Sequence, residues 1–479
     1  MHLDDDTSRL PIKIDSTSNG EYAPLRLPKI NQLGNTLARE TISRCADRLN
    51  VERRRFLNTA CAAAATLFSF SSVNAAAGRR GGSFAVSEDS LFDNELAVQE
   101  LGGDEFIFDA QGHYVVPPSL VRTLKPGCRN EHPVLSRDYM RCLGADAFIK
   151  DVFLDSDTDM MMLSFVPSLR SEEPLTIAEA AATREIVERM ERHHRLLIHG
   201  RVNPNQAGDL ESMDELADRW DISAWKCYTQ WGPDGRGFYL DDPNTGLPFI
   251  EKAVRLGIRN ICIHKGIPFG KRSYEHSLCT DIGRVAARFP DVNFLVYHSG
   301  YIPGRAEGPY DPARGEGVDE LIRSVLDAGL GRHSNVYAEL GTTWRLLMRD
   351  PVEAAHCVGK LVKYLGDNNV LYGSDSVWYG SPQDQIQAFR TFQISAEFQE
   401  RFGYSAMTEP LRAKIFGLNA ARVYRVALPE VLQRARGDAV ATAREEYRND
   451  PTPHFGTYGP RTRREFIDLM KLQRNNGAS

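Results

Sequence analysis

The stretch EFIFDAQGH, residues 105–113, joins a short apolar run to a polar end, and three later stretches repeat this arrangement. They are NICIH (260–264), FLVYH (294–298) and VLYGSD (370–375). A continuous apolar run of this length is typical of a strand buried on both faces, as in a parallel sheet. The four runs end at His113, His264, His298 and Asp375. Because the carboxyl ends of parallel strands meet at one rim of a barrel, these side chains predict one polar site there.

Eight candidate strands alternate with amphipathic stretches after residue 104. The predicted strands are 105–109, 159–165, 195–200, 222–228, 259–264, 292–298, 335–340 and 370–375. Segments between them, such as VDELIRSVLDAGL (318–330), repeat apolar residues every three or four positions, as helices covering a sheet require. The alternation predicts an α/β fold, the (β/α)8 barrel of the TIM type. A doubly wound sheet is the alternative, but no glycine-rich nucleotide motif follows the first strand.

The chain of 479 residues divides into three predicted regions. Residues 1–77 form a polar preface followed by a signal-like segment, and residues 104–426 form the barrel. Residues 427–479 form a helical tail that is expected to pack against the barrel or against a neighbouring subunit.

The segment ERRRFLNTACAAAATLFSFSSVNAAAG, residues 52–78, has the order of an export signal: charged residues, an apolar run, then small residues. Arg53 and Arg54 before RFLN resemble a twin-arginine motif. The apolar part is short for a membrane span, so a removable signal cut near Ala75 to Ala77 is expected. This interpretation predicts export machinery as a partner and a periplasmic or secreted protein. The alternative is a buried helix within the folded chain, with a cytoplasmic location if the signal is not used.

The composition describes an ordinary globular protein, with 42% hydrophobic residues, 25% charged residues and a net charge of -6. The basic clusters are short and isolated, so no nucleic-acid partner is expected. The eight cysteines contain no CxxC pair, which gives no sign of a zinc knuckle or a thioredoxin-like site. The expected partner is a small-molecule substrate, and a homo- or hetero-oligomer is compatible with the sequence.

Six fragments occur in an order that resembles the amidohydrolase superfamily, in the branch that holds metal-dependent amidohydrolases and related decarboxylases. They are DAQGH (109–113), DSDTDMMMLSFVP (155–167), ICIHKG (261–266), YHSGY (297–301), LYGSDS (371–376) and KIFGLNAARVY (414–424). The resemblance implies a barrel that binds a divalent metal ion, with zinc foremost and manganese or iron as alternatives.

The resemblance also implies a role for each matching position. The family's HxH metal pair falls on Gln111 and His113, so an amide replaces the first imidazole. An amide oxygen is a poorer zinc ligand than imidazole. His264 and Asp375 match metal ligands, and Asp375 also handles protons. His298 matches a histidine that binds a second metal or polarises the substrate, and Lys226 matches a bridging carbamylated lysine.

Other residues near the predicted rim could line a substrate pocket. His199 and Glu339 end the third and seventh predicted strands, where a structural role is an equal alternative. Four aromatic residues follow rim strands, where they could shape specificity or simply pack in loops: Tyr301, Trp344, Trp378 and Tyr379.

The expected function is metal-dependent hydrolysis of an amide, lactone or related carbonyl bond by activated water, with Asp375 and His298 as the catalytic residues. Two alternatives stay open. One is non-oxidative decarboxylation of an aromatic or unsaturated acid at the same site. The other is a degenerate barrel that serves as a binding or partner subunit. It is suggested by Gln111, which replaces a metal-binding histidine of the family.

Overall fold

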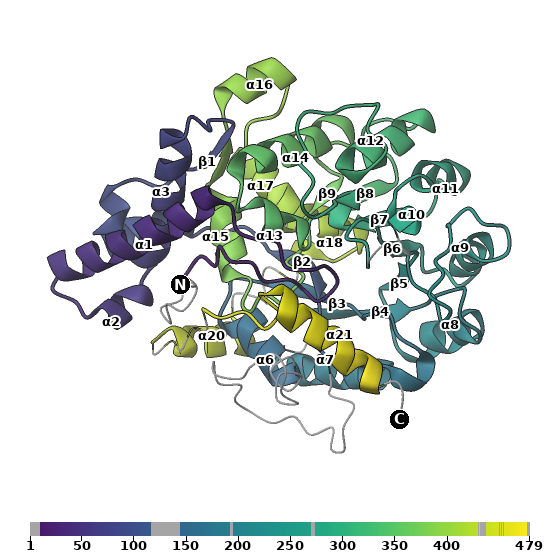
Figure 1. The fold of residues 1–479 in the computed structure, drawn as a ribbon. Coiled ribbons are helices and arrows are strands. Elements are labelled where there is room, and N and C mark those ends of the chain that lie inside the picture. The colour runs from purple at the N-terminus through teal and green to yellow at the C-terminus, as the bar shows by residue number, and fades with distance from the viewer. Residues whose placement is uncertain are drawn as a thin grey trace.

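Eight parallel strands form the centre of the computed structural model, in the order in which they occur along the chain (Figure 1). They are β2 (Phe108–Gly112), β3 (Met160–Leu163), β4 (Leu196–Arg201), β5 (Ala224–Tyr228), β6 (Asn260–His264), β7 (Asn293–Tyr297), β8 (Val336–Glu339) and β9 (Val370–Leu371). The structure describes residues 10–115, 144–191, 195–269, 274–429, 431, 437–449, 451, 453 and 455–476.

The sheet closes between its last and first strands. Ala110 N donates to Tyr372 O at 3.0 Å, Asp375 N donates to Gln111 O at 2.9 Å, and Val377 N donates to His113 O at 3.0 Å. These bonds join the segment after β9 to β2, so the predicted (β/α)8 barrel of the TIM type is confirmed.

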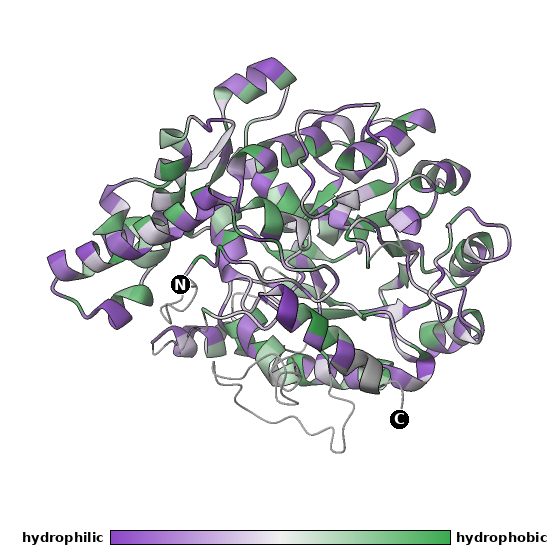
Figure 2. Ribbon diagram, viewed as in Figure 1, coloured by the Kyte–Doolittle hydropathy of each residue, from purple (hydrophilic) through white to green (hydrophobic). Residues whose placement is uncertain are grey.

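Helices follow most of the strands and cover the outside of the barrel (Figure 1). They are α7 (Ile177–Glu191), α8 (Asp209–Arg219), α9 (Gly246–Arg255), α10 (Tyr274–Ser277), α11 (Ile282–Arg288), α12 (Gly317–Asp327), α13 (Thr343–Leu347), α14 (Pro351–Tyr364) and α15 (Gln383–Thr391). Figure 2 shows that these outer helices carry both hydrophobic and hydrophilic residues, as helices with one face on a sheet require. Before β3 lie α6 (Ala145–Ile149) and η2 (Lys150–Leu154), and η3 (Arg170–Glu172) follows it.

Two predicted strands differ from the structure by three or more residues at one or both ends, and the other six by one or two. The first was expected at 105–109 but β2 runs from Phe108, because Ile107 N bonds the Asp159 side chain at 3.0 Å before the regular ladder begins. The last was expected at 370–375 but β9 ends at Leu371. Beyond it, Tyr372 N donates to Ile415 O at 2.9 Å, so the backbone leaves the ladder with β8.

Side chains inside the barrel form a core of their own, separate from the core between strands and helices. Its members include Phe108, Met160 and Leu295. At the amino-terminal end of the strands, the helical run α17 (Glu409–Ala413), η6 (Lys414–Leu418) and α18 (Asn419–Val423) contributes Ala420, and the ring of Tyr424 lies 5.3 Å from that of Phe108. The floor of the barrel is therefore apolar and filled, which leaves the opposite rim for a polar site.

The segment with the signal-like sequence folds as α2 (Arg53–Leu57) and α3 (Ala60–Ala76). Ala62, Leu67 and Phe70 on α3 are at most 1% exposed, and α3 packs against α1 (Lys29–Arg48) and α4 (Asn94–Leu101). The folded chain thus shows the buried helix that was the alternative to a removable signal. In the described part of the chain, no helix is both long and apolar enough to cross a membrane. Export through the twin-arginine route stays a prediction.

Two short strands connect this amino-terminal region to the barrel. β1 (Gly82–Phe84) pairs antiparallel with β10 (Phe392–Ile394), which follows α15. Nearby lie η1 (Asp89–Leu91) and α16 (Ala396–Phe402).

Residues 10–28, which we call the N-terminal strap, run in irregular conformation to the mouth of the barrel (Figure 1). The carboxy-terminal tail holds α20 (Ala439–Asn449) and α21 (Arg463–Asn476). The tail contacts the strap directly, since Ser18 N donates to Pro460 O at 2.9 Å and the hydroxyls of Thr17 and Thr457 lie 2.7 Å apart. The tail therefore packs on the barrel and the strap of its own chain.

Candidate functional site

The alternation of side chains along the strands aims several polar residues into the barrel. Cys262 belongs to the inner core, so His264, two positions later on β6, points the same way. The same period carries Ala224 to Lys226 on β5 and Tyr337 to Glu339 on β8. These inner positions lie above the apolar floor, at the carboxyl ends of their strands.

Other site residues reach the same rim through local departures from regular strand geometry. The pairing of β2 with β3 shifts register between Asp109 and Gly112, which re-aims Gln111. His298 and Asp375 have φ angles of 65° and 56°, in the left-handed region that non-glycine residues rarely adopt. Such conformations cost on the order of 1–3 kcal/mol each and concentrate at functional sites.

The first group of contacts surrounds Asp375. Its Oδ1 accepts from Gln111 Nε2 at 3.0 Å and lies 3.3 Å from His113 Nε2. Its Oδ2 accepts from Asn19 Nδ2 at 3.0 Å and from the hydroxyl of Thr342. Every carboxylate oxygen thus has a partner, and one partner comes from the N-terminal strap.

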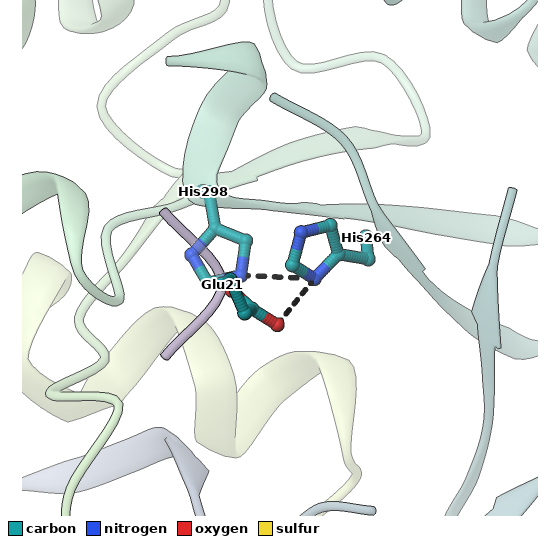
Figure 3. Close-up of side chains that lie close together, drawn as sticks. All are labelled: Glu21, His264 and His298. Carbon is teal, nitrogen blue, oxygen red and sulfur yellow. Dashed lines mark hydrogen bonds and ion pairs between the residues drawn. The ribbon is translucent and has the colours of Figure 1, made fainter. Parts of the chain in front are cut away.

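The second group joins His264, His298 and Glu21 (Figure 3). His298 Nε2 lies 3.2 Å from His264 Nδ1, and Glu21 Oε1 lies 3.8 Å from the same His264 nitrogen. Gln111 Nε2 connects the two groups, because it lies 3.2 Å from His113 Nε2 and 3.5 Å from His298 Nε2. The structure therefore brings together the five residues predicted as metal ligands.

Glu339 holds the backbone around His298. Its Oε2 accepts from His298 N at 3.1 Å and its Oε1 accepts from Gly341 N at 2.6 Å. Gly341 O in turn lies 2.7 Å from His298 Nδ1, which fixes the ring. Burial raises the pKa of Glu339 to about 8. These contacts hold the backbone around His298, and a place for Glu339 in the substrate pocket stays a prediction.

Lys226 and His199 lie deeper among aromatic rings. Lys226 Nζ lies 3.7 Å from the centre of the Tyr297 ring and has no hydrogen-bond partner among the described residues. Burial lowers the pKa of Lys226 to about 8 and that of His199 well below its usual range. His199 Nε2 lies 3.3 Å from the Tyr297 hydroxyl. Both side chains are fully buried at the predicted rim.

Burial and neighbouring charges set the protonation of the site. Burial lowers the pKa of His298 to about 4, and burial together with the His298 charge lowers the pKa of His264 well below its usual range. Burial alone would raise the pKa of Asp375, but the hydrogen bond and charge of His113 outweigh it and lower that pKa. At neutral pH the site therefore offers the neutral imidazoles of His264 and His298 and the ionised carboxylate of Asp375, the forms that bind metal ions.

The aromatic residues expected near the site have different surroundings. Trp344 is a packing residue, because its ring meets Phe389 and its Nε1 donates to Gln385 O at 2.9 Å. Tyr379 lies closer to the site residues, because its hydroxyl lies 2.9 Å from that of Thr342, which donates to Asp375. The ring of Trp378 lies 6.0 Å from that of His113, and Tyr301 is 7% exposed.

Comparison with known proteins identifies the barrel. The family model described as Amidohydrolase matches residues 151–426, which is more than half of the chain. The chain belongs to the amidohydrolase family. A search of curated proteins finds no match. A solved amidohydrolase from Mycobacterium avium subsp. paratuberculosis K-10 is similar at 12% identity with a TM-score of 0.38, over 68% of this chain and 100% of that chain.

The match places some site residues of this amidohydrolase inside the family region and others outside it. His264, His298 and Asp375 lie within residues 151–426. Gln111 and His113 precede it, and so does the whole N-terminal strap.

Sequence reasoning missed the residues that the strap brings to the amidohydrolase site. Asn19 and Glu21 lie in a polar stretch without periodicity, far from any predicted strand, so nothing in the sequence marked them. Thr342 was missed because its hydroxyl reaches Asp375 through an unusual backbone turn, with φ 54°.

The donor set of this amidohydrolase fits a divalent metal ion. His298 Nε2 and His264 Nδ1 face each other, and His264 Nε2 and Gln111 Oε1 have no hydrogen-bond partner among the described residues. Neutral imidazoles with carboxylates are the usual ligands of zinc and related ions.

The site is closed to solvent in this conformation. His264 and His298 are 0% exposed, Asp375 is 1% exposed and His113 is 2% exposed. Asn19 and Glu21 of the strap contact these residues, so the strap is part of what covers the site.

Proposed function

We propose that this amidohydrolase is a metal-dependent hydrolase that cleaves an amide, lactone or related carbonyl bond in a small organic molecule. The observation that carries the proposal is one network of contacts at the rim of the barrel. In it, the Gln111 amide meets His113, His298 and Asp375, and His298 meets His264. The buried imidazoles, which are neutral in His264 and His298, and one ionised carboxylate are suited to hold a cation and to move a proton.

His113, His264, His298, Gln111 and Asp375 would hold the cation, for which we propose zinc, with manganese or iron as alternatives. When bound, such an ion lowers the pKa of a water molecule and polarises a carbonyl group. The side chains of the site would carry out the other steps of the reaction.

Asp375 is the proposed proton acceptor. Thr342 and Asn19 donate to its Oδ2, while Oδ1 faces His113 and Gln111, so the carboxylate is held in one orientation. A proton taken from the attacking water would reside on Asp375 until it passes to the leaving group.

His298 is proposed to hold the cation at the point where the substrate oxygen would be polarised. Its Nδ1 hydrogen donates to Gly341 O at 2.7 Å, which directs Nε2 into the site. Lys226 is proposed to be carbamylated, since its amine lacks a hydrogen-bond partner among the described residues and burial lowers its pKa to about 8. A larger neutral amine fraction favours reaction with carbon dioxide.

The test compares the natural protein with Asp375→Asn and with the control Asp367→Asn. Asp367 precedes β9 and forms an ion pair with Lys414, whereas Asp375 follows β9 at the rim. We expect stoichiometric metal by elemental analysis, hydrolysis of members of an amide and lactone panel, and loss of activity after chelation. Activity of Asp375→Asn should fall at least about 100-fold, while the control stays near the natural level. A metal-free protein whose activity ignores both treatments contradicts the proposal.

The same preparation separates the alternative functions. Carbon dioxide release from a panel of aromatic and unsaturated acids, without hydrolysis of amides or lactones, would identify a decarboxylase. A protein with neither activity nor metal affinity, in which Gln111→His creates both, would identify a degenerate barrel with a binding role.

A further inference from the structure

We propose that Glu21 of the N-terminal strap is a metal ligand, which completes the site of His264 and His298 with a carboxylate from outside the barrel. The inference rests on the metal dependence proposed above and adds a ligand that no strand of the barrel supplies. It concerns a residue 130 positions before the family region, which begins at residue 151.

The separations between the three donor atoms fit one ion. His264 Nδ1 lies 3.2 Å from His298 Nε2 and 3.8 Å from Glu21 Oε1, and all three donors lie within 4.8 Å of one another. Two ligands that each lie about 2.1 Å from a tetrahedral ion are separated by about 3.4 Å. The observed distances lie on both sides of that value, so a small shift would let all three atoms reach one cation.

The orientations of His298 and Glu21 also support a cation bound between these two side chains and His264. Gly341 O holds the Nδ1 side of His298, so its Nε2 presents a lone pair toward His264 (Figure 3). Asn19 Nδ2 donates to Glu21 Oε2 at 2.6 Å, which leaves Oε1 as the oxygen that faces His264. A cation would therefore meet one free lone pair from each of two side chains that are already fixed.

Charge gives a second, independent argument. Asn19 Nδ2 donates to Glu21 and also to Asp375 Oδ2 at 3.0 Å, so one amide lies between two carboxylates. Glu21 has an 18% exposed side chain and Asp375 is almost fully buried. Two ionised carboxylates this close repel each other, and a bound cation would relieve that repulsion. Glu21 would also make up for the imidazole that Gln111 lacks.

The strap is anchored well enough to deliver a ligand. Lys13 Nζ lies 3.0 Å from Asp384 Oδ1, and Asp15 Oδ1 accepts from the Arg345 guanidinium at 2.8 Å. At the other end, the hydroxyls of Tyr22 and Tyr379 lie 3.3 Å apart. Glu21 thus lies between fixed points on the barrel.

The experiment measures the affinity of metal-stripped protein for Zn²⁺ and for Mn²⁺ by calorimetry. Glu21→Gln removes the charge and keeps the shape, whereas the control Glu215→Gln removes an exposed carboxylate on α8. We expect Glu21→Gln to bind metal roughly 10–100-fold more weakly, as for the loss of a group that matters to a metal site. Glu215→Gln should bind close to the natural level.

The outcomes separate this inference from the proposed function. If the natural protein binds neither ion, the proposed function fails. If it binds metal and Glu21→Gln binds equally well, only the role of Glu21 is refuted. Equal affinity together with a higher kcat/KM in Glu21→Gln would mean that the carboxylate competes with substrate, which also refutes the ligand role.

A crystallographic measurement keeps the inference testable if Glu21→Gln does not fold. Anomalous scattering from the natural protein soaked in Mn²⁺ or Zn²⁺ should place the ion within bonding distance of a Glu21 oxygen, His264 Nδ1 and His298 Nε2. An ion bound at the rim without Glu21 overturns it.

Discussion

The side-chain amide of Asn19 donates to Asp375 Oδ2 at 3.0 Å, across 356 positions of sequence. This bond ties the N-terminal strap to the carboxylate with the central catalytic role in the proposed hydrolysis. Because Asn19 also holds Glu21, the strap connects both groups of side chains at the rim. The barrel alone therefore does not contain the whole site.

Loosening the strap should expose the rim. Arg345→Met removes the guanidinium that bonds Lys13 O and Asp15, and we expect hydrogen exchange of the amides in residues 10–22 to become at least about tenfold faster. Exchange in strands β5 to β8 should stay slow. The control is Arg219→Met, which removes a highly exposed ion pair to Glu215. Equal protection of the strap in both variants would contradict an anchoring role for Arg345.

Gln111→His should strengthen metal binding. An imidazole at this position restores the nitrogen donor that the family's metal pair carries, and we expect metal affinity to rise about tenfold because imidazole is a better ligand for zinc than an amide. Calorimetry with Zn²⁺ measures the change. Weaker binding would mean that the amide itself, bonded to Asp375 at 3.0 Å, organises the site.

Glu339→Gln should disturb His298 without touching substrate. The carboxylate accepts from His298 N and Gly341 N, and an amide would turn a donor toward one of these hydrogens. We expect a loss of about 1–3 kcal/mol in the free energy of unfolding and about 10–100-fold weaker metal binding. Chemical denaturation and calorimetry provide the two values. A fully stable variant that loses only activity would instead indicate that Glu339 takes part in catalysis.

Acid should destabilise the protein partly through His356. Burial lowers the pKa of His356 to about 4 from an ordinary value of 6.5. Between pH 6.5 and pH 4 the unfolded chain binds a proton that the folded chain does not, so the free energy of unfolding falls as the pH falls through this window. His356→Phe should make that slope shallower. Tyr404→Phe, which removes the 3.1 Å partner of His356 Nδ1 but keeps the histidine, is the control and should retain the slope.

The intact mass of the protein decides between export and retention of the amino-terminal region. Cleavage near Ala75 to Ala77 would remove α3 and also Asn19 and Glu21, whereas an uncleaved chain keeps the strap in the site. The prediction of a twin-arginine signal requires the shortened mass in a periplasmic or secreted fraction, and full length after Arg53→Lys with Arg54→Lys. Full-length protein that stays in the cytosol would contradict that prediction.

The barrel could be predicted because its strands are apolar runs that alternate with helical segments along the chain. The carboxyl ends of parallel strands arranged in this way meet at one rim. His264 follows Cys262 in strict alternation, so its direction was readable from sequence. His298 and Asp375 were predicted at the rim because they end apolar runs, but the directions of their side chains could not be predicted from alternation, because their backbones adopt positive φ angles. Once the register shift in β2 is known, the position of Gln111 follows as well.

The strap could not be predicted because its structure depends on contacts distant in sequence. Asn19 and Glu21 belong to no periodic pattern, and their partners lie on β6 and beyond β9. The sequence of segment 60–76 supports two interpretations for a related reason. Its apolar, alanine-rich composition suits a signal, yet it suits equally well a helix enclosed by α1 and α4.

The bond between Thr17 and Thr457 spans 440 positions, and this has a consequence for biosynthesis. Residue 457 is synthesised long after residue 17, so the strap cannot gain this support until that part of the tail has left the ribosome. Until then, the rim residues that Asn19 and Glu21 contact would stay more accessible than in the folded chain.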